Sequence, residues 1–322
     1  MPPTAPQPLI DAHPDTGSLR RDVVEGLRRS QKEIPSKYLY DARGSQLFDA
    51  ICELEEYYPT RTEMAIMQEC IGEMAAALGP NVQLIEYGSG SSLKTRILLD
   101  HLSDLAGYVP VDISREHLLD AAKTLAAAYP TVAVQPVCAD YTADMPLPEL
   151  PHGARRVVYY PGSTIGNFQP PAAESFLRSI AERVRPDGGL LIGVDLRKSP
   201  ELLRAAYNDG DGVTAAFNKN LLRRINRELD ADFDLDQFHH EARWNASAGC
   251  IEMHLVSTAP QTAHVDGIAF RFAEGESIRT EYSYKYTLDG FAQIAKHAGL
   301  SIDTVWTDDA GLFSVQYATV PS

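Results

Sequence analysis

The sequence predicts an α/β protein built on a doubly wound, mostly parallel sheet, and two features carry this prediction. Segments typical of strands and of helices alternate from residue 82 to residue 196. The first strand, VQLIEY at 82–87, is an apolar run suited to a sheet that is buried on both faces, and the glycine turn GSG at 88–90 follows it directly. Such turns hold nucleotide-like ligands in α/β sheets, because the free N–H groups at the helix start face the ligand.

The other elements follow from the spacing of apolar residues. We expect further strands at 108–111, 131–137, 156–160 and 190–194, and helices at 18–29, 115–128 and 172–184. Pro59 should end one helical segment, and Thr60-Arg61-Thr62-Glu63 should cap the next. Leu93 should lie on the apolar side of the helix that follows the glycine turn.

The pattern changes at residue 198. Residues 200–230 are expected to be helical with a break near 209–212, and alternating runs at 251–257, 268–273 and 278–286 are typical of antiparallel strands. A helix at 288–298 and strands at 304–306 and 312–320 should then complete the sheet. An inserted segment within the α/β core is the simplest interpretation.

Composition excludes several classes of function. Lys and Arg number 29 against 44 Asp and Glu, a net charge of −15 that repels phosphate backbones, so we expect no nucleic-acid partner. Four scattered cysteines and nine histidines lack the spacing of metal ligands, so we expect no metal and the reduced thiols of a cytoplasmic protein. We expect no membrane association, because no segment resembles a signal peptide or could span a bilayer.

The residues around the glycine turn narrow the choice of ligand. A dinucleotide site needs a third glycine where Leu93 stands, and a phosphate-binding P-loop needs a Gly-Lys-Ser/Thr ending that is absent here. Glu-x-Gly-x-Gly instead resembles the first motif of Rossmann-like methyltransferases that use S-adenosylmethionine (SAM), although a plain strand-to-helix turn remains an alternative. Asp112, which ends the second strand 24 residues after Gly88, is spaced to meet ribose hydroxyls. Asp140 and Tyr141 follow the third strand.

Several longer stretches occur together in one order. These are YDARGSQLFD (40–49), EYYPTRTE (56–63), GSTIGN (162–167), GVTAAFN (212–218), IEM (251–253) and EYSYKY (281–286). In them the sequence resembles the bacterial L-histidine Nα-methyltransferases, SAM-dependent enzymes that make hercynine, the trimethylated histidine of ergothioneine biosynthesis. The resemblance implies a class I SAM methyltransferase fold, L-histidine and its mono- and dimethyl forms as small-molecule ligands, and a cytoplasmic protein that we expect to be a monomer.

The resemblance also implies site residues, position by position. Those implied to bind SAM are Tyr40, Gly88, Lys94, Asp112, Asp140 and Tyr141. Those implied to bind histidine are Phe48, Tyr57, Gly162, Asn167, Tyr207, Thr214, Met253, Glu281 and Ser283. Among them, the residues expected to act on the reacting amine are Tyr57, Asn167 and Gly162.

Taken alone, these residues also admit structural interpretations. Glu281, Ser283 and Lys285 alternate with tyrosines, which fits a strand whose polar face meets water as well as one that lines a pocket. Asn167 could cap the turn after the fourth strand, and Met253 could belong to the core. The pocket interpretation has the imidazole nitrogens bind Glu281 and Ser283, so that a side chain without a donor is rejected.

From these expectations follow a domain division and three candidate functions. Residues 1–59 should form N-terminal helices that contribute to the substrate cleft, 60–198 with 285–322 the Rossmann-like SAM-binding domain, and 199–284 an inserted α+β substrate-binding domain. The leading function is SAM-dependent trimethylation of L-histidine. The alternatives are an N-methyltransferase of another amino acid or aromatic amine, and a SAM-binding regulatory protein without catalysis.

Overall fold

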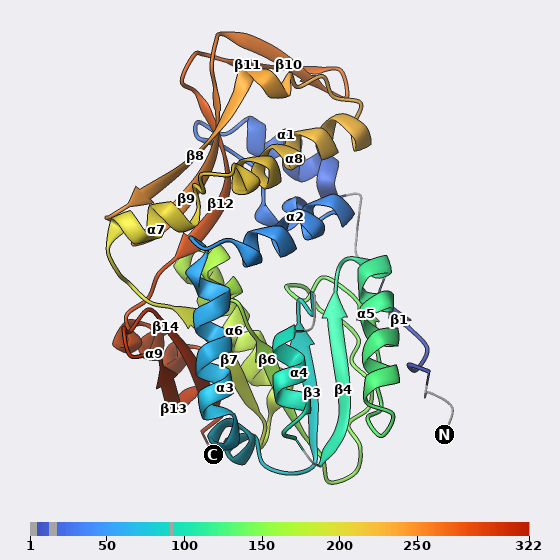
Figure 1. Ribbon diagram of the computed structural model, residues 1–322. Coiled ribbons are helices and arrows are strands. Elements are labelled where there is room, and N and C mark those ends of the chain that lie inside the picture. Colours follow the sequence, from blue (N-terminus) through green and yellow to red (C-terminus); the bar gives the residue numbers. More distant parts are fainter. Residues whose placement is uncertain (1–4, 13–17, 91–92, 103, 322) are drawn as a thin grey trace. The chain divides into compact units, whose positions relative to one another are not determined.

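The chain passes repeatedly between two compact units (Figure 1). The computed structural model describes residues 5–12, 18–90, 93–102 and 104–321. The first unit comprises Met1–Pro14, Pro59–Arg197 and Tyr286–Ser322, and the second comprises Asp15–Tyr58 and Lys198–Lys285.

The first unit is organised on an eight-stranded sheet. In sheet order its strands are β1 (Ile10–Asp11), β5 (Val137–Cys138), β4 (Leu105–Asp112), β3 (Val82–Tyr87), β6 (Arg155–Tyr160), β7 (Gly189–Asp195), β14 (Phe313–Thr319) and β13 (Ser301–Thr307). The strands from β1 to β7 are parallel, and β14 and β13 add antiparallel to that edge. The chain winds outward from β3 in both directions, so the predicted doubly wound, mostly parallel sheet is confirmed. The glycine turn after β3 therefore lies where such sheets bind ligands.

Helices cover both faces of this sheet (Figure 1). They are α3 (Tyr58–Leu78), α4 (Leu93–Leu99), α5 (Arg115–Ala128), η2 (Thr164–Asn167), α6 (Pro170–Val184) and α9 (Leu288–His297). Side chains of β3 alternate between the faces. Leu84 packs in one core cluster with Met67 of α3 and Leu98 of α4, whereas Tyr87 contacts Phe176 of α6 on the other face.

The second unit combines a four-stranded sheet, a hairpin and helices. In sheet order its strands are β2 (Lys32–Glu33), β12 (Ser277–Tyr284), β9 (Cys250–Ser257) and β8 (Phe238–Asn245), and the hairpin is β10 (Gln261–Val265) with β11 (Ile268–Phe272). The helices are α1 (Ser18–Leu27), η1 (Ser36–Leu39), α2 (Ala42–Glu53), α7 (Pro200–Ala206), α8 (Val213–Glu228) and η3 (Leu235–Gln237). Helix α2 packs on α8, and α8 packs on β8, so segments far apart in sequence share this unit.

Several sequence predictions were wrong in detail. The strand expected at 131–137 is reduced to β5, because Pro110 of β4 and Pro136 lack the N–H groups that would continue its ladders with β4 and β1. Strands β8 and β10 were missed, and α3 begins at Tyr58 with Pro59 in its first turn, where the missing N–H is tolerated. Leu93 is 51% exposed, and α4 buries Thr95, Leu98 and Leu99 instead.

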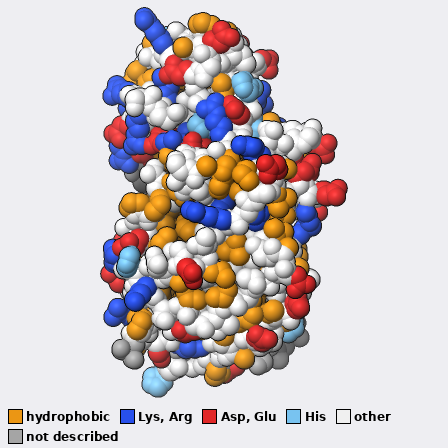
Figure 2. All heavy atoms as spheres, turned by 90° about the vertical axis from the view of Figure 1, so that its left-hand side faces the viewer, with side chains coloured by type: hydrophobic (Ala, Val, Ile, Leu, Met, Phe, Trp, Pro, Cys, Tyr) orange, Lys and Arg blue, Asp and Glu red, His pale blue; other side chains and the backbone are white. Residues whose placement is uncertain are grey.

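Charged side chains of both signs are exposed on the surface (Figure 2). On the face shown in Figure 2, Lys and Arg side chains are interspersed with Asp and Glu side chains. Some exposed charges form ion pairs, such as that of Arg20 with Asp266 at 2.5 Å. No helix in the described part of the chain is long and apolar enough to span a bilayer.

Candidate functional site

The first group of predicted site residues surrounds the turn after β3. Gly88 and Gly90 have φ values of +75° and +41°, in the left-handed region that favours glycine. The Gly88 N–H donates to the Val111 carbonyl oxygen at 2.9 Å, which ties the turn to β4. A Cβ built on Gly88 would meet no atom of the described residues within 4 Å, so a ligand can approach the backbone closely here.

The side chain of Glu86, in the strand before this turn, holds the turn through hydrogen bonds to its neighbours. Its side chain is buried, and its Oε2 accepts hydrogen bonds from the Thr95 hydroxyl at 2.6 Å and from the Tyr108 hydroxyl. Burial raises the pKa of Glu86 to about 7, although both hydroxyls favour its ionised form. Glu86 thus joins β3, α4 and β4, and its role in the glycine motif is to hold the turn.

Two carboxylates follow the next strands of the sheet. Asp112 ends β4 and accepts from the Ser114 N–H at 2.8 Å, and burial raises its pKa. Asp140 follows β5 and accepts from the Thr142 N–H at 2.9 Å. Tyr141 stacks on Tyr87, with ring centroids 5.2 Å apart and planes 2° apart. Carboxyl ends of parallel strands meet at one sheet edge, so both acids and the turn share that edge.

Glu63 of α3 links two of the predicted residues. It is fully buried and forms an ion pair with Lys94 of α4. The Gly162 N–H, after β6, donates to Glu63 Oε2 at 2.9 Å and to Oε1 at 3.1 Å. The predicted capping role of Glu63 was therefore wrong, because Lys94 and Gly162 attract the carboxylate into the interior. A Cβ on Gly193 would lie 2.9 Å from Glu63 Cδ, so a glycine is required there.

In the second unit, aromatic rings form what we call the aromatic cluster: Tyr40, Phe48, Tyr57, Tyr207 and Phe217. Centroid distances are 5.5 Å from Tyr40 to Phe48, 6.2 Å from Phe48 to Tyr57 and 6.1 Å from Tyr57 to Tyr207. Phe217 packs on both Tyr40 and Phe48. Burial raises the pKa of Tyr57 well above its ordinary value, so this hydroxyl keeps its proton.

The β12–β9 ladder brings two further predicted residues face to face. Glu281 lies directly opposite Met253, and directly opposed residues of an antiparallel pair share one face of the sheet. Glu281 is 9% exposed, and its Oε2 has no hydrogen-bond partner among the described residues. Burial raises the pKa of Glu281 to about 8, and the charge of Lys285 opposes this rise. A buried carboxyl in this state is suited to a ligand that brings an N–H donor.

A hydrogen-bonded group of side chains adjoins Glu281 along β12. The Tyr207 hydroxyl lies 2.7 Å from Ser283 Oγ, and Lys285 Nζ donates to both oxygens. His240 holds the backbone of Tyr207: its Nδ1 accepts from the Asn218 amide at 2.9 Å, and its Nε2 then donates to the Tyr207 carbonyl oxygen at 2.8 Å. Burial lowers the pKa of His240, which favours this neutral ring.

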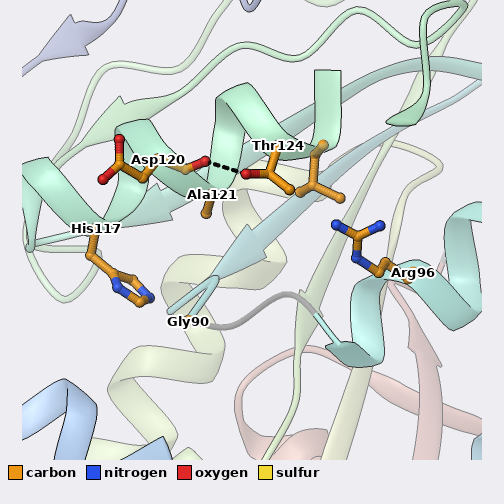
Figure 3. A pocket seen from close by; sticks show the side chains of 7 residues that line it. Gly90, Arg96, His117, Asp120, Ala121 and Thr124 are labelled. Atoms are coloured by element: carbon orange, nitrogen blue, oxygen red, sulfur yellow. Dashed lines mark hydrogen bonds between the residues drawn. The ribbon is translucent and has the colours of Figure 1, made fainter. Parts of the chain in front are cut away.

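A cavity of about 230 Å³ lies between α4 and α5 beside the glycine turn (Figure 3). Its lining residues are Gly90, Arg96, His117, Asp120, Ala121, Thr124 and Leu125. The Thr124 hydroxyl donates to the Asp120 carbonyl oxygen at 2.8 Å within the helix. The residues predicted to bind SAM do not line this cavity, so it borders the turn without containing the predicted site.

Comparison with known proteins decides the family. A family model described as "Histidine-specific methyltransferase, SAM-dependent" matches residues 19–320. The chain belongs to this family. It is 43% identical to the histidine N-alpha-methyltransferase of Mycolicibacterium smegmatis and 42% identical to that of Mycobacterium tuberculosis, over 94% of each chain in both cases. It is 31% identical to ergothioneine biosynthesis protein 1 of Neurospora crassa, over 86% of this chain and 32% of that protein.

For a member of this family, the first unit fits the expected cofactor. The glycine turn leaves room for a close ligand, and the carboxylates of Asp112 and Asp140 can accept from hydroxyl and amino groups such as those of SAM. Five of the six residues predicted to bind SAM lie in this unit, and Tyr40 lies in the other.

The residues predicted to bind histidine are divided in the same way. Gly162 and Asn167 follow β6 in the first unit, where Asn167 ends η2. The members in the second unit are Phe48, Tyr57, Tyr207, Thr214, Met253, Glu281 and Ser283. Their roles remain predictions.

Sequence reasoning missed Glu63, His240 and Lys285. For Lys285 a signal existed, since its alternation with tyrosines placed it on the same face as Glu281 and Ser283. Glu63 and His240 gave none, because their partners are distant in the chain.

Proposed function

We propose that this protein transfers three methyl groups in succession from SAM to the α-amino nitrogen of L-histidine, forming hercynine in ergothioneine biosynthesis. The observation that carries the proposal is the buried Oε2 of Glu281, which has no hydrogen-bond partner among the described residues. An unpaired buried carboxyl is costly, so the site favours a ligand with a ring N–H. Ser283, on the same face of β12, offers a hydroxyl to the second imidazole nitrogen. Side chains without a donor leave Glu281 unpaired and are rejected.

In this proposal SAM is held by Tyr40, Gly88, Lys94, Asp112, Asp140 and Tyr141. When bound, SAM supplies an electrophilic methyl group on its sulfonium, and S-adenosylhomocysteine is the product that leaves. Asp112 would accept from the ribose hydroxyls and Asp140 from the adenine amino group. Lys94, already paired with Glu63, is fixed in orientation by that pair. A mobile lysine would lose more side-chain entropy on binding a ligand.

The chain's own groups orient the amine. Methyl transfer requires a neutral nitrogen, and Tyr57 keeps its own proton, so its oxygen can accept an N–H from the amine without taking a proton. The Gly162 carbonyl is the second proposed acceptor, and the hydrogen bond from the Gly162 N–H to Glu63 anchors this residue. Asn167 and the Tyr207 hydroxyl would hold the substrate carboxylate. Positioning of this kind can lower a barrier by several kcal/mol.

Three transfers make the amine bulkier and finally fix a positive charge on it. The rings of Tyr40 and Phe48, 5.5 Å apart, can accommodate such a cation through cation–π contact. The mono- and dimethyl forms of histidine are therefore proposed ligands of the same residues. We also propose that the protein acts as a monomer in the cytoplasm. A single chain supplies every proposed site residue, and the four cysteines form no disulfide among the described residues.

The test is direct. The protein is incubated with SAM and, separately, with each of the twenty amino acids, and mass spectrometry counts the methyl groups gained. The proposal expects histidine alone to gain three. Methylation of another amino acid or an aromatic amine would support the second candidate function. No acceptor, together with retained SAM binding, would support a regulatory protein.

A further inference from the structure

Lys285 is an unusual residue to find in the interior. It follows β12 directly and is 2% exposed. Its Nζ donates to the Tyr207 hydroxyl at 2.8 Å and to Ser283 Oγ at 2.7 Å, and it lies 4.7 Å from the centroid of the Tyr207 ring. Burying an ammonium group costs several kcal/mol unless its surroundings compensate. Two hydroxyl acceptors and the face of the Tyr207 ring contribute to this compensation.

The direction of these hydrogen bonds matters for a ligand. An ammonium group only donates, so Tyr207 and Ser283 must each use an oxygen lone pair to accept from Lys285. Their hydroxyl protons therefore point away from Lys285. One of these protons lies in the 2.7 Å hydrogen bond between Tyr207 and Ser283, so the pair has one proton left for a ligand. A hydroxyl that accepts from a cation is also polarised and becomes a stronger donor.

We propose that Lys285 is a positioning residue of the amino-acid site. It holds Tyr207 and Ser283 as a hydrogen-bonded pair that leaves one O–H donor for the ligand, either from Tyr207 to a carboxylate oxygen or from Ser283 to an unprotonated ring nitrogen. Where Ser283 is that donor and Glu281 accepts from the other ring nitrogen, the site selects one neutral tautomer of an imidazole. This inference rests on the proposed function, because it takes this hydroxyl pair to face the amino acid.

A different role is that Lys285 merely offsets the charge of Glu281. That role predicts that any cation at position 285 suffices and that Ser283 is irrelevant to the effect. The two roles are separated by Lys285→Met, which removes the charge at similar length, by Lys285→Arg, which keeps the charge with a different donor geometry, and by Ser283→Ala in each background. Lys123→Met is the matched control, because Lys123 is exposed and pairs with the exposed Asp120 of the same helix.

The experiment measures the Kd of L-histidine and of S-adenosylhomocysteine by calorimetry, with kcat and KM for methyl transfer. We expect Lys285→Met and Lys285→Arg each to raise the histidine Kd and KM by about tenfold or more, with the S-adenosylhomocysteine Kd changed by less than about twofold. Ser283→Ala should raise the histidine Kd by a clearly smaller factor in the Lys285→Met background than in the wild type, because Lys285 and Ser283 act together. Equal costs in both backgrounds, or full rescue by Lys285→Arg, would overturn the inference.

The same variants distinguish misfolding from the loss of the positioning role of Lys285. If Lys285→Met fails to fold, the comparison between Lys285→Arg and the wild type decides alone. A wild-type protein that binds histidine without methylating it would refute the proposed function and leave the Lys285 comparison valid as a binding measurement. A wild type that does not bind histidine would refute both.

Discussion

Replacing Glu281 by Gln should make the protein more stable at alkaline pH while weakening histidine binding. The native pKa of about 8 lies above the ordinary value of 4.5, so the native state holds this proton more tightly than the unfolded state does. The free energy of unfolding therefore falls as pH rises from about 4.5 to about 8 and is level above that range. The pKa difference between 4.5 and about 8 corresponds to a loss of at most ~5 kcal/mol in the free energy of unfolding. A glutamine side chain cannot ionise, so the free energy of unfolding of the variant does not fall with pH for this reason.

The amide of Gln also needs buried partners, at a cost of roughly 1–3 kcal/mol that does not depend on pH. The informative quantity is thus how the stability difference between Glu281→Gln and the wild type changes with pH. Urea or thermal unfolding at pH 5 and pH 9 should show the difference moving in favour of the variant by several kcal/mol, a Tm change on the order of 10 °C. Glu86, whose pKa is also raised, titrates in both proteins, so its contribution cancels in the stability difference.

Glu276→Gln is the matched control in the same unit. Burial tends to raise the pKa of Glu276, but the ion pair with Lys32 and the Ala273 N–H outweigh it and hold the pKa below its ordinary value. Its charge therefore stabilises the native state above about pH 4.5, and the control should be less stable than the wild type without gaining on it between pH 5 and 9. A stability difference for Glu281→Gln that is flat over this range would refute the idea of a carboxyl that resists ionisation.

Three further predictions concern positioning. Gly193→Ala would place a Cβ 2.9 Å from Glu63 Cδ and 3.1 Å from a Phe313 ring carbon, so urea unfolding should show a loss of about 2 kcal/mol; wild-type stability would mean that Glu63 moves freely. Asp112→Asn should raise the S-adenosylhomocysteine Kd by about tenfold and leave the histidine Kd unchanged, and calorimetry showing unaltered cofactor affinity would remove Asp112 from that site. His240→Ala should cost about 1 kcal/mol in unfolding experiments and raise the KM for histidine, because the Tyr207 backbone loses its donor; an unchanged KM would show that Tyr207 is held by other contacts.

The architecture was predictable where local patterns carry it. The apolar strand, the glycine turn and the alternation up to residue 196 all report on short segments, and the structure places them as expected. Prediction was weaker where a strand carries no alternation: β8 (FHHEARWN) is mostly half-buried, so its polar and apolar residues do not separate by face. The shortening of the strand at 131–137 depends on Pro110 and Pro136, a signal that was present in the sequence and was not weighed.

Interior charges were the least predictable part of the candidate site. A Thr-x-x-Glu stretch has the same sequence whether its Glu caps a helix or enters the core. The outcome for Glu63 depends on Lys94, 31 residues later, and on Gly162, 99 residues later. Lys285 was visible as part of an alternating strand, but its partner Tyr207 lies 78 residues earlier, at the end of a helix. Such pairings are decided by tertiary packing.

The second unit has a consequence for engineering by recombination. It is assembled from two stretches, Asp15–Tyr58 and Lys198–Lys285, and the first of them supplies Tyr40, Phe48 and Tyr57 while the other supplies Tyr207 and Phe217. A chimera that swaps one stretch with a homologue would join rings from two parents that never evolved to fit each other. Exchanging acceptor preference between relatives should therefore succeed only when both stretches are transplanted together.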